Sequence, residues 1–431
     1  MSAEVAVSAR VRNPGWRVTF AGLGINLALG VLYAWSIVAG GIPASWGWDQ
    51  SDKQWPYSIA CLVFCLVMVP AGRLQDRLGP RGVATLGGVL VGLGMVMAAL
   101  CGLYAPNHTL LGFILGFGVL AGAGIGFGYA SATPPAVKWF PPAKTGLIAG
   151  LVVSGFGLAS VYVTPLASAL IASVGLAGTV LILGIGFLVV VCALAQLLKP
   201  PPAGYVPAGT PVAKVSTGPV KKAEFTPREV LKTWQFYLIW FLYACGAGAG
   251  LMVISVAQKI GSAAAVGAIV VVSLAIGNGA GRIGAGILSD KLGRKAALVL
   301  FFVLQTVMVL GLSQAKPQTA LGSAVALVVM AALVGANYGS NLALFPSIAK
   351  DFYGLKNFGV NYGLVFTAWG IGGFMLAKFA GWVYDGKIVA AWKGSFEFAY
   401  YTSAALLVLA AILTLTLKAP HHLEKSQKGA A

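Results

Sequence analysis

The residue best placed to do chemistry is Arg282, because it lies within an apolar stretch long enough to cross a membrane. A guanidinium inside a membrane span costs at least about 2.5–3.5 kcal/mol, and Arg294 and Lys295 already anchor that end of the stretch. Arginine stays protonated and offers a planar fork of donors that matches a carboxylate. The alternative is a buried ion pair with another span, but all eleven acidic residues read as loop or span-end positions. We therefore predict that Arg282 binds a substrate carboxylate.

Asn278 lies four residues before Arg282 and so on the same helical face. Its amide could orient the guanidinium or bind a substrate oxygen; the alternative is an amide that only packs helices together. Aromatic side chains within other apolar stretches are further candidates, because a ring packs against a short carbon chain while a hydroxyl binds oxygen; packing alone is again the alternative. These candidates are Tyr33, Tyr129, Tyr338, Phe366 and Trp369.

A second cation, Lys378, lies near the outer end of the apolar stretch at 359–384. We expect its long side chain to reach the membrane interface, as lysines near span ends do. Arg282 is then the one cation that we expect inside the membrane. This favours a monocarboxylate substrate over a dianion.

The composition indicates a membrane protein, because 58% of the 431 residues are hydrophobic and 9% are charged, against roughly 25% charged in soluble proteins. We predict an all-α membrane protein with twelve transmembrane helices in two six-helix bundles, residues 1–198 and 236–431, joined by a cytoplasmic linker loop at 199–235. The predicted spans are 16–41, 55–73, 82–104, 109–134, 144–172, 175–198, 236–258, 261–288, 296–315, 319–345, 359–384 and 394–417.

The net charge of +18 is explained by membrane topology and not by a nucleic-acid partner. Of the 29 Lys and Arg residues, 22 fall on the side of the termini and the linker and 5 on the other side. The positive-inside rule places the first side in the cytoplasm. No cleavable signal peptide is recognised before the first span, which is long enough to remain. We expect a multi-pass protein of the lipid bilayer of a bacterial inner membrane, with both termini cytoplasmic.

Two segments with one pattern follow the second and eighth predicted spans. Segments 72–81 and 286–295 both read G-x-L-x-D-[RK]-L-G-x-[RK] and lie 214 residues apart. Glycines permit tight turns, and each Asp could accept hydrogen bonds from a helix N-terminus or a cation. We predict a cytoplasmic latch that forms in one conformational state; charge that only sets topology is the alternative. The latch residues are Gly72, Asp76, Arg77, Gly286, Asp290, Lys291 and Arg294.

This paired motif resembles the signature of the major facilitator superfamily between spans 2 and 3 and between spans 8 and 9. The second copy fits nearly residue for residue, whereas Pro80 in the first stands where the family often has a basic residue. The resemblance covers essentially the whole chain. It implies two six-helix bundles that rock around a central site.

Within that superfamily the chain resembles the monocarboxylate porter family, which includes the bacterial oxalate–formate exchangers. Segment 139–150 is similar to the family's entry to span 5, and segment 13–16 loosely resembles its Gly-x-Trp entry to span 1. Segments 343–347 and 361–363 resemble spans 10 and 11 of the oxalate exchanger. The family shares an arginine at the place of Arg282, and the resemblance implies that this arginine holds the substrate carboxylate.

Three positions depart from residues that carry function in these relatives. Mammalian-type porters have an Asp at the place of Asn278 and a Lys at the place of Ile37, and they couple protons through that Asp. The oxalate exchanger has a second essential Lys where this chain has Trp369. The known proton relay and the second cation are therefore not carried over to these positions.

The predicted function is a secondary active transporter that moves a small monocarboxylate, such as L-lactate or pyruvate, by alternating access, with a proton as co-substrate. Anion entry alone is opposed by about 2.3 kcal/mol per 100 mV of inside-negative potential, and a co-transported proton removes that opposition. The first alternative is an oxalate/formate-type exchanger. A receptor or scaffold is a different class, but no loop is long enough for a sensing domain.

No enzymatic activity, cofactor or metal site is predicted. The three histidines, His108, His421 and His422, fall in loops or in the tail, and the five cysteines read as small apolar side chains. No Walker-type loop is present, so ion gradients must supply the energy. We expect the protein to work as a monomer.

Overall fold

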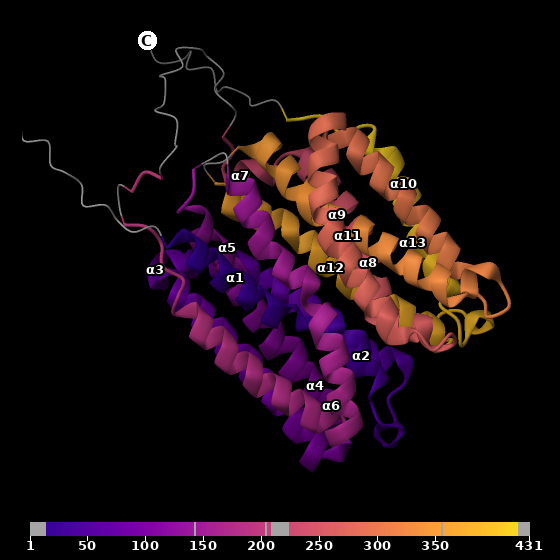
Figure 1. The fold of residues 1–431 in the computed structure, drawn as a ribbon. Helices are drawn as coiled ribbons and strands as arrows, with labels where there is room; N and C mark the ends of the chain where they lie inside the picture. Colours follow the sequence, from indigo (N-terminus) through magenta and orange to yellow (C-terminus); the bar gives the residue numbers. More distant parts are fainter. Residues whose placement is uncertain (1–13, 142–143, 203–204, 208–223, 355–356, 421–431) are drawn as a thin grey trace, which may run out of the picture.

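A computed structural model describes residues 14–141, 144–202, 205–207, 224–354 and 357–420, and the side chains of Asp76 and Thr145 lie outside that description. Every regular element in these residues is a helix (Figure 1). The long elements are α1 (Gly15–Leu29), continued by η1 (Gly30–Ala34) and α2 (Trp35–Gly40), α3 (Gln50–Tyr104), α4 (Thr109–Phe113), continued by η4 (Ile114–Ala121) and α5 (Gly122–Val137), α6 (Thr145–Ala195), α8 (Trp234–Ser262), α9 (Gly267–Leu292), α10 (Arg294–Ser313), α11 (Ala324–Tyr353), α12 (Phe358–Tyr384) and α13 (Glu397–Thr414). The short ones are η2 (Ala44–Trp46), η3 (Pro106–His108), α7 (Pro227–Val230), η6 (Ala320–Gly322) and η7 (Ala390–Trp392).

Eleven helical stretches of the described chain are long and apolar enough to cross a membrane, and one of them, Gly146–Ala195, has 50 residues. At about 1.5 Å per residue, that stretch is more than twice as long as a hydrocarbon core of about 30 Å. It reverses at Gly175, where φ is 71° and ψ is 176°. Helix α6 therefore supplies two crossings, which gives the twelve that the sequence predicts. The prediction of an all-α membrane protein is confirmed.

The two copies of the repeated motif make the same backbone turn. Gly79 interrupts α3 with φ 73° and ψ 167°, and Gly293 separates α9 from α10 with φ 85° and ψ 154°. A side chain at positive φ clashes with the backbone, so glycine is the residue that fits. The repeat thus encodes the reversal between consecutive spans.

The indigo-to-magenta helices α1–α6 lie side by side, and the orange-to-yellow helices of the second part of the chain lie beside them (Figure 1). We call residues 14–202 the first half and residues 224–420 the second half. The halves meet chiefly where α3 packs on α12 and where α6 packs on α9. Small residues allow this, since a Cβ at Gly370 would lie 2.5 Å from the carbonyl oxygen of Cys61. The bundle boundaries at 198 and 236 stay a prediction.

The halves also touch at one membrane face, where α3 begins and α12 ends. Polar residues of both halves gather there, among them Asp49, Lys259 and Asp385. We call it the Asp49 face. That this face lies outside the cell stays a prediction from the charge distribution of the sequence.

Candidate anion-binding site

Arg282 is buried where α9 of the second half meets α6 of the first. The residue is 9% exposed. Its Nε donates to Oδ1 of Asn278 at 3.1 Å, and its Nη1 donates across the halves to the carbonyl oxygen of Val153 at 2.9 Å. The pairing of Arg282 with Asn278 follows from their spacing of one helical turn. The contact with Val153 places the guanidinium on the boundary between the halves.

Glycines bring neighbouring backbones close to this pair. A Cβ at Gly281 would overlap the carbonyl group of Ala336, so α9 packs on α11 at backbone contact, which fixes the turn that carries Arg282. On the other side, a Cβ at Gly157 of α6 would lie 3.3 Å from Nη2 of Arg282 and 3.4 Å from Cγ of Asn278. Gly157 therefore lets the guanidinium rest directly against α6.

Two buried donors of this pair lack a partner. Neither Nη2 of Arg282 nor Nδ2 of Asn278 makes a hydrogen bond within the described residues, and no ion pair among those residues includes Arg282. A buried donor left unpaired costs about 1–3 kcal/mol, and a charged one costs more. The two oxygens of one carboxylate could accept from both donors and balance the charge. The arrangement is thus chemically suited to a carboxylate.

A hydrogen-bonded chain of aromatic residues crosses between the halves beside this pair. The hydroxyl groups of Tyr33 and Tyr338 lie 2.5 Å apart, and Nε1 of Trp369 donates to the Tyr338 hydroxyl at 2.7 Å. The Phe366 ring stacks on Trp369 with centroids 5.1 Å apart and planes 10° apart. Tyr33 belongs to the first half and the other three belong to the second. Four of the predicted residues therefore form one connected cluster.

Phe156 of α6 joins this cluster to the guanidinium. Its ring packs edge-on against Tyr33 and Tyr129, with centroids 4.9 Å and 5.3 Å apart. The next residue is Gly157, which faces Arg282, and the Arg282 charge acts on both phenols. The structure thus brings all seven predicted substrate-binding residues into one region. Phe156 was not predicted from the sequence, because nothing in its spacing distinguishes it from an aromatic residue that only packs helices together.

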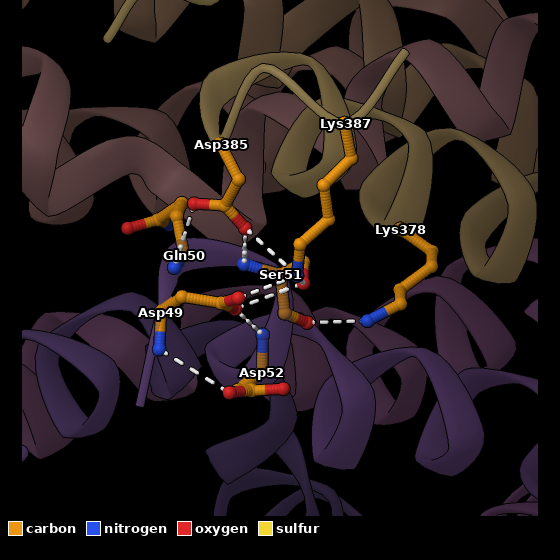
Figure 2. Close-up of polar contacts among 7 residues, drawn as sticks. All are labelled: Asp49, Gln50, Ser51, Asp52, Lys378, Asp385 and Lys387. Carbon is orange, nitrogen blue, oxygen red and sulfur yellow. Dashed lines mark hydrogen bonds and ion pairs between the residues drawn. The ribbon is translucent and has the colours of Figure 1, made fainter. Parts of the chain in front are cut away.

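Lys378 differs from its expected place. We predicted an ammonium that extends to the membrane interface, but the residue is 1% exposed. Its Nζ points from α12 into the first half and donates to the carbonyl oxygen of Ser51 at 2.5 Å (Figure 2). It also lies 3.9 Å from the centre of the Trp55 ring. The physical reason is that α3 and the Asp49 face cover the end of α12, so the side chain finds its partners inside the protein.

The contacts of the second repeated motif lie within one half of the protein. Arg294 donates to Asp290 at 2.7 Å and to Asp351 at 3.0 Å, which ties α9, α10 and α11 of one half together. Lys291 and Arg77 are exposed, and the Asp76 side chain lies outside the described residues. Neither Gly72 nor Gly286 has any neighbour within 4 Å of a Cβ built there. No other part of the described chain therefore approaches these two glycines closely, and a latching role for the motifs stays a prediction.

Several known transporters are similar in sequence to this chain. It is 31% identical to the uncharacterized MFS-type transporter YhjX of Escherichia coli over 80% of this chain and 83% of that protein. It is 27% identical to the oxalate:formate antiporter of Oxalobacter formigenes over 79% and 77% of the two chains. It is 26% identical to mouse monocarboxylate transporter 11 over 86% and 81%.

The sequence model of the Major Facilitator Superfamily matches residues 18–377 and 251–431. The fold is similar to the crystal structure of a bacterial homologue of the human lysosomal transporter Spinster, in an inward-facing and unoccupied conformation, with a TM-score of 0.65. That similarity covers 94% of this chain and 97% of the other at 16% identity, so it concerns the fold alone. The chain therefore belongs to the major facilitator superfamily and is a multi-pass membrane transporter rather than an enzyme.

Proposed function

We propose that this transporter moves small monocarboxylates, such as L-lactate or pyruvate, by alternating access. The observation that carries the proposal is the buried Arg282–Asn278 pair, whose two unpaired donors lie at the boundary between the halves. One fixed cation matches one carboxylate. The aromatic side chains of Tyr33, Tyr129 and Phe366 offer apolar surface to a short carbon chain.

The position of the pair suits a transport cycle. Arg282 contacts Val153 of the other half, and Tyr33 contacts Tyr338 of the other half. An anion bound here would touch both halves at once. Movement of one half against the other changes these contacts, and a ligand shifts such an equilibrium only when its affinity differs between the states.

We propose proton symport as the energy coupling. Entry of an anion alone against an inside-negative potential is opposed by about 2.3 kcal/mol per 100 mV, and one proton carried with it cancels that opposition. Asn278 does not titrate, so the proton travels with the substrate or on a carboxylate outside the Arg282 pair, such as Asp76 or Asp290. The positive-inside charge pattern supports an inner-membrane location with both termini cytoplasmic, and we propose a functional monomer.

Carboxylate exchange is the second candidate. Two observations favour it: the oxalate:formate antiporter is similar over most of its length, and Lys378 is a second buried cation. An exchanger needs no proton, because each anion that enters is matched by one that leaves.

Uptake of radiolabelled L-lactate by proteoliposomes that contain the purified protein separates the two candidates. Symport predicts uptake into empty vesicles when the outside is more acidic, and a protonophore abolishes it. Exchange predicts uptake only into vesicles preloaded with lactate, formate or oxalate, whatever the pH gradient. If neither L-lactate nor pyruvate is taken up under either condition, the monocarboxylate assignment is rejected.

A further inference from the structure

Lys378 holds a buried positive charge that no carboxylate neutralises by direct contact. None of the ion pairs within the described residues includes Lys378, and its one hydrogen bond goes to the Ser51 carbonyl oxygen of the other half. The Trp55 ring covers the ammonium at 3.9 Å. Burying an ammonium is costly unless the charge is matched. A carbonyl group and a ring match it only in part, so the side chain retains affinity for an anion.

A second polar side chain with unused hydrogen-bonding capacity lies beside it. Gln54 is fully buried, and both its Nε2 and its Oε1 lack a partner within the described residues. A Cβ at Gly381 would lie 3.1 Å from Cγ of Gln54 and 2.8 Å from Cα of Ser51. Gly381 follows Lys378 by one helical turn, and Gln54 follows Ser51 by one turn, so the four residues share one contact between α3 and α12. The contact thus combines a cation with an amide that is free to donate.

The Asp49 face closes over this contact. Both carboxylate oxygens of Asp385 accept hydrogen bonds from α3, one from the Gln50 amide at 3.0 Å and one from the Ser51 amide at 2.7 Å (Figure 2). Lys387 pairs with Asp49 and donates to Oγ of Ser51 at 2.6 Å. All of these contacts join the start of α3 to the end of α12. Separation of the two helices breaks them together with the bond from Lys378 to Ser51.

We propose that Lys378 and Gln54 form a second carboxylate site, which the substrate anion occupies between the Asp49 face and Arg282 when α3 and α12 separate. The proposal rests on the proposed function, since it takes the substrate to be a carboxylate. Separation removes the Ser51 carbonyl from the ammonium, and the carboxylate of the substrate replaces it. Lys378 follows Trp369 by nine residues on α12, which places it about 13 Å further along the helix. It is therefore a separate binding site on the path of the substrate through the protein and no part of the Arg282 site.

The test uses initial rates of L-lactate uptake from the Asp49 face of oriented proteoliposomes, measured as Vmax/KM from low to high potassium chloride. A cation on the route attracts the anion, and salt screens that attraction because the Debye length falls from about 30 Å at 0.01 M to about 3 Å at 1 M. We expect Lys378→Gln to lower Vmax/KM about ten-fold at low salt and to flatten its salt dependence. Lys378→Arg keeps the charge and stays near wild type.

Two further variants separate the site from general effects. Lys316→Gln removes an exposed cation that pairs with Glu397 within the second half, and its salt dependence should follow wild type. Gln54→Leu removes the amide without a change of charge, and it should lower Vmax/KM several-fold with the salt dependence retained. Melting temperatures near wild type for all variants show that each protein is folded.

A salt dependence of Lys378→Gln that runs parallel to wild type would overturn the second site, because a lysine that only packs the helices does not attract the anion. In that case, loss of transport in Arg282→Lys would leave the proposed function standing. If wild type moves oxalate but neither lactate nor pyruvate, the monocarboxylate assignment fails alone. The same salt comparison with oxalate then decides the second site.

Discussion

The carboxylate of Asp385 accepts a hydrogen bond of 2.7 Å from the backbone amide of Ser51, which lies 334 residues earlier and in the other half of the transporter. The first amide groups of a helix have no partner within that helix. At the start of α3, the residue that follows α12 thus supplies the missing partner of the Ser51 amide. Closure of the Asp49 face is therefore coupled to completion of a helix terminus.

Replacement of Asp385 by Asn should loosen this face. The variant loses the negative charge and one of two acceptors, and a hydrogen bond to a charged group contributes about 1.5–3 kcal/mol. We expect the amides of Gln50 and Ser51 to exchange with deuterium about ten- to a hundred-fold faster, as followed by mass spectrometry. Asp351→Asn is the control, because Asp351 pairs with Arg294 within one half. Unchanged exchange in Asp385→Asn would show that the carboxylate does not hold the face closed.

The contribution of the Asp49–Lys387 ion pair to closure of the Asp49 face should not depend on pH in the physiological range. Partial burial alone would raise the pKa of Asp49, but the hydrogen bond from Lys387 and that from the Asp52 amide lower this pKa from 3.8 to about 2. The hydrogen bond to Asp49 raises the pKa of Lys387 above 10.5. A lowered carboxyl pKa stabilises the closed face above pH 3.8 and loses that effect as pH falls towards 2. A raised lysine pKa stabilises it below pH 10.5 and loses that effect as pH rises further.

Both contributions are complete between about pH 5 and pH 9. The difference in amide exchange at the start of α3 between wild type and Lys387→Gln, corrected for the intrinsic effect of pH, should therefore stay constant from about pH 5.5 to pH 8. A pH dependence of lactate uptake in this range then does not come from this ion pair. A difference that changes several-fold across the range would contradict this account of the pair.

Gly157 should be sensitive to a single methyl group. Its Cβ would lie 3.3 Å from Nη2 of Arg282, so Gly157→Ala has to displace the guanidinium by a few tenths of an ångström. We expect the KM for L-lactate to rise about three- to ten-fold, since a displacement of that size weakens a charged hydrogen bond by about 1 kcal/mol. Gly186→Ala is the control, because it lies in the same α6 and a Cβ there meets nothing within 4 Å. Equal KM values for the two variants would argue that Gly157 does not border the substrate site.

The Tyr338 hydroxyl should contribute more to stability than the Tyr33 hydroxyl. Tyr338→Phe leaves the Tyr33 hydroxyl and Nε1 of Trp369 without their bonds, whereas Tyr33→Phe removes one bond. A buried polar group left unpaired costs about 1–3 kcal/mol, so Tyr338→Phe should show the lower melting temperature. Tyr162→Phe is the control, because its hydroxyl donates one hydrogen bond to the Leu27 carbonyl oxygen and the loss of that bond leaves no other side chain unpaired. A lower melting temperature for Tyr33→Phe than for Tyr338→Phe would mean that the Tyr338 hydroxyl is not the centre of this hydrogen-bonded chain.

Much of this transporter could be predicted from the sequence, because the membrane limits what a chain can do. Apolar runs of the right length predict the spans, and the repeated motif marks the reversals at Gly79 and Gly293. Arg282 could be identified because a charge inside a span is costly and is rarely present without a function. Its partner Asn278 could be identified because a spacing of four residues is one helical turn.

Contacts between distant spans were beyond prediction, because they depend on how each helix is rotated about its axis. Val153 and Phe156 reach the site through the rotation of α6, and their spacing carries no signal of this. Lys378 was misplaced for the same reason: sequence places it near a helix end, but whether α3 covers that end is a tertiary fact. Asp49 and Asp385 read as acids near span ends, and nothing local indicates that they meet the same helix terminus.

The most direct test of the central claim is L-lactate uptake by proteoliposomes containing Arg282→Lys. This variant keeps the positive charge but loses the planar fork and the bond from Nη1 to Val153. The carboxylate site proposed here predicts that proton-driven uptake falls about ten- to a hundred-fold, the loss expected when charged hydrogen bonds worth about 1.5–3 kcal/mol are removed. Uptake equal to wild type, from a variant with an unchanged melting temperature, would contradict the assignment of Arg282 as the substrate anchor.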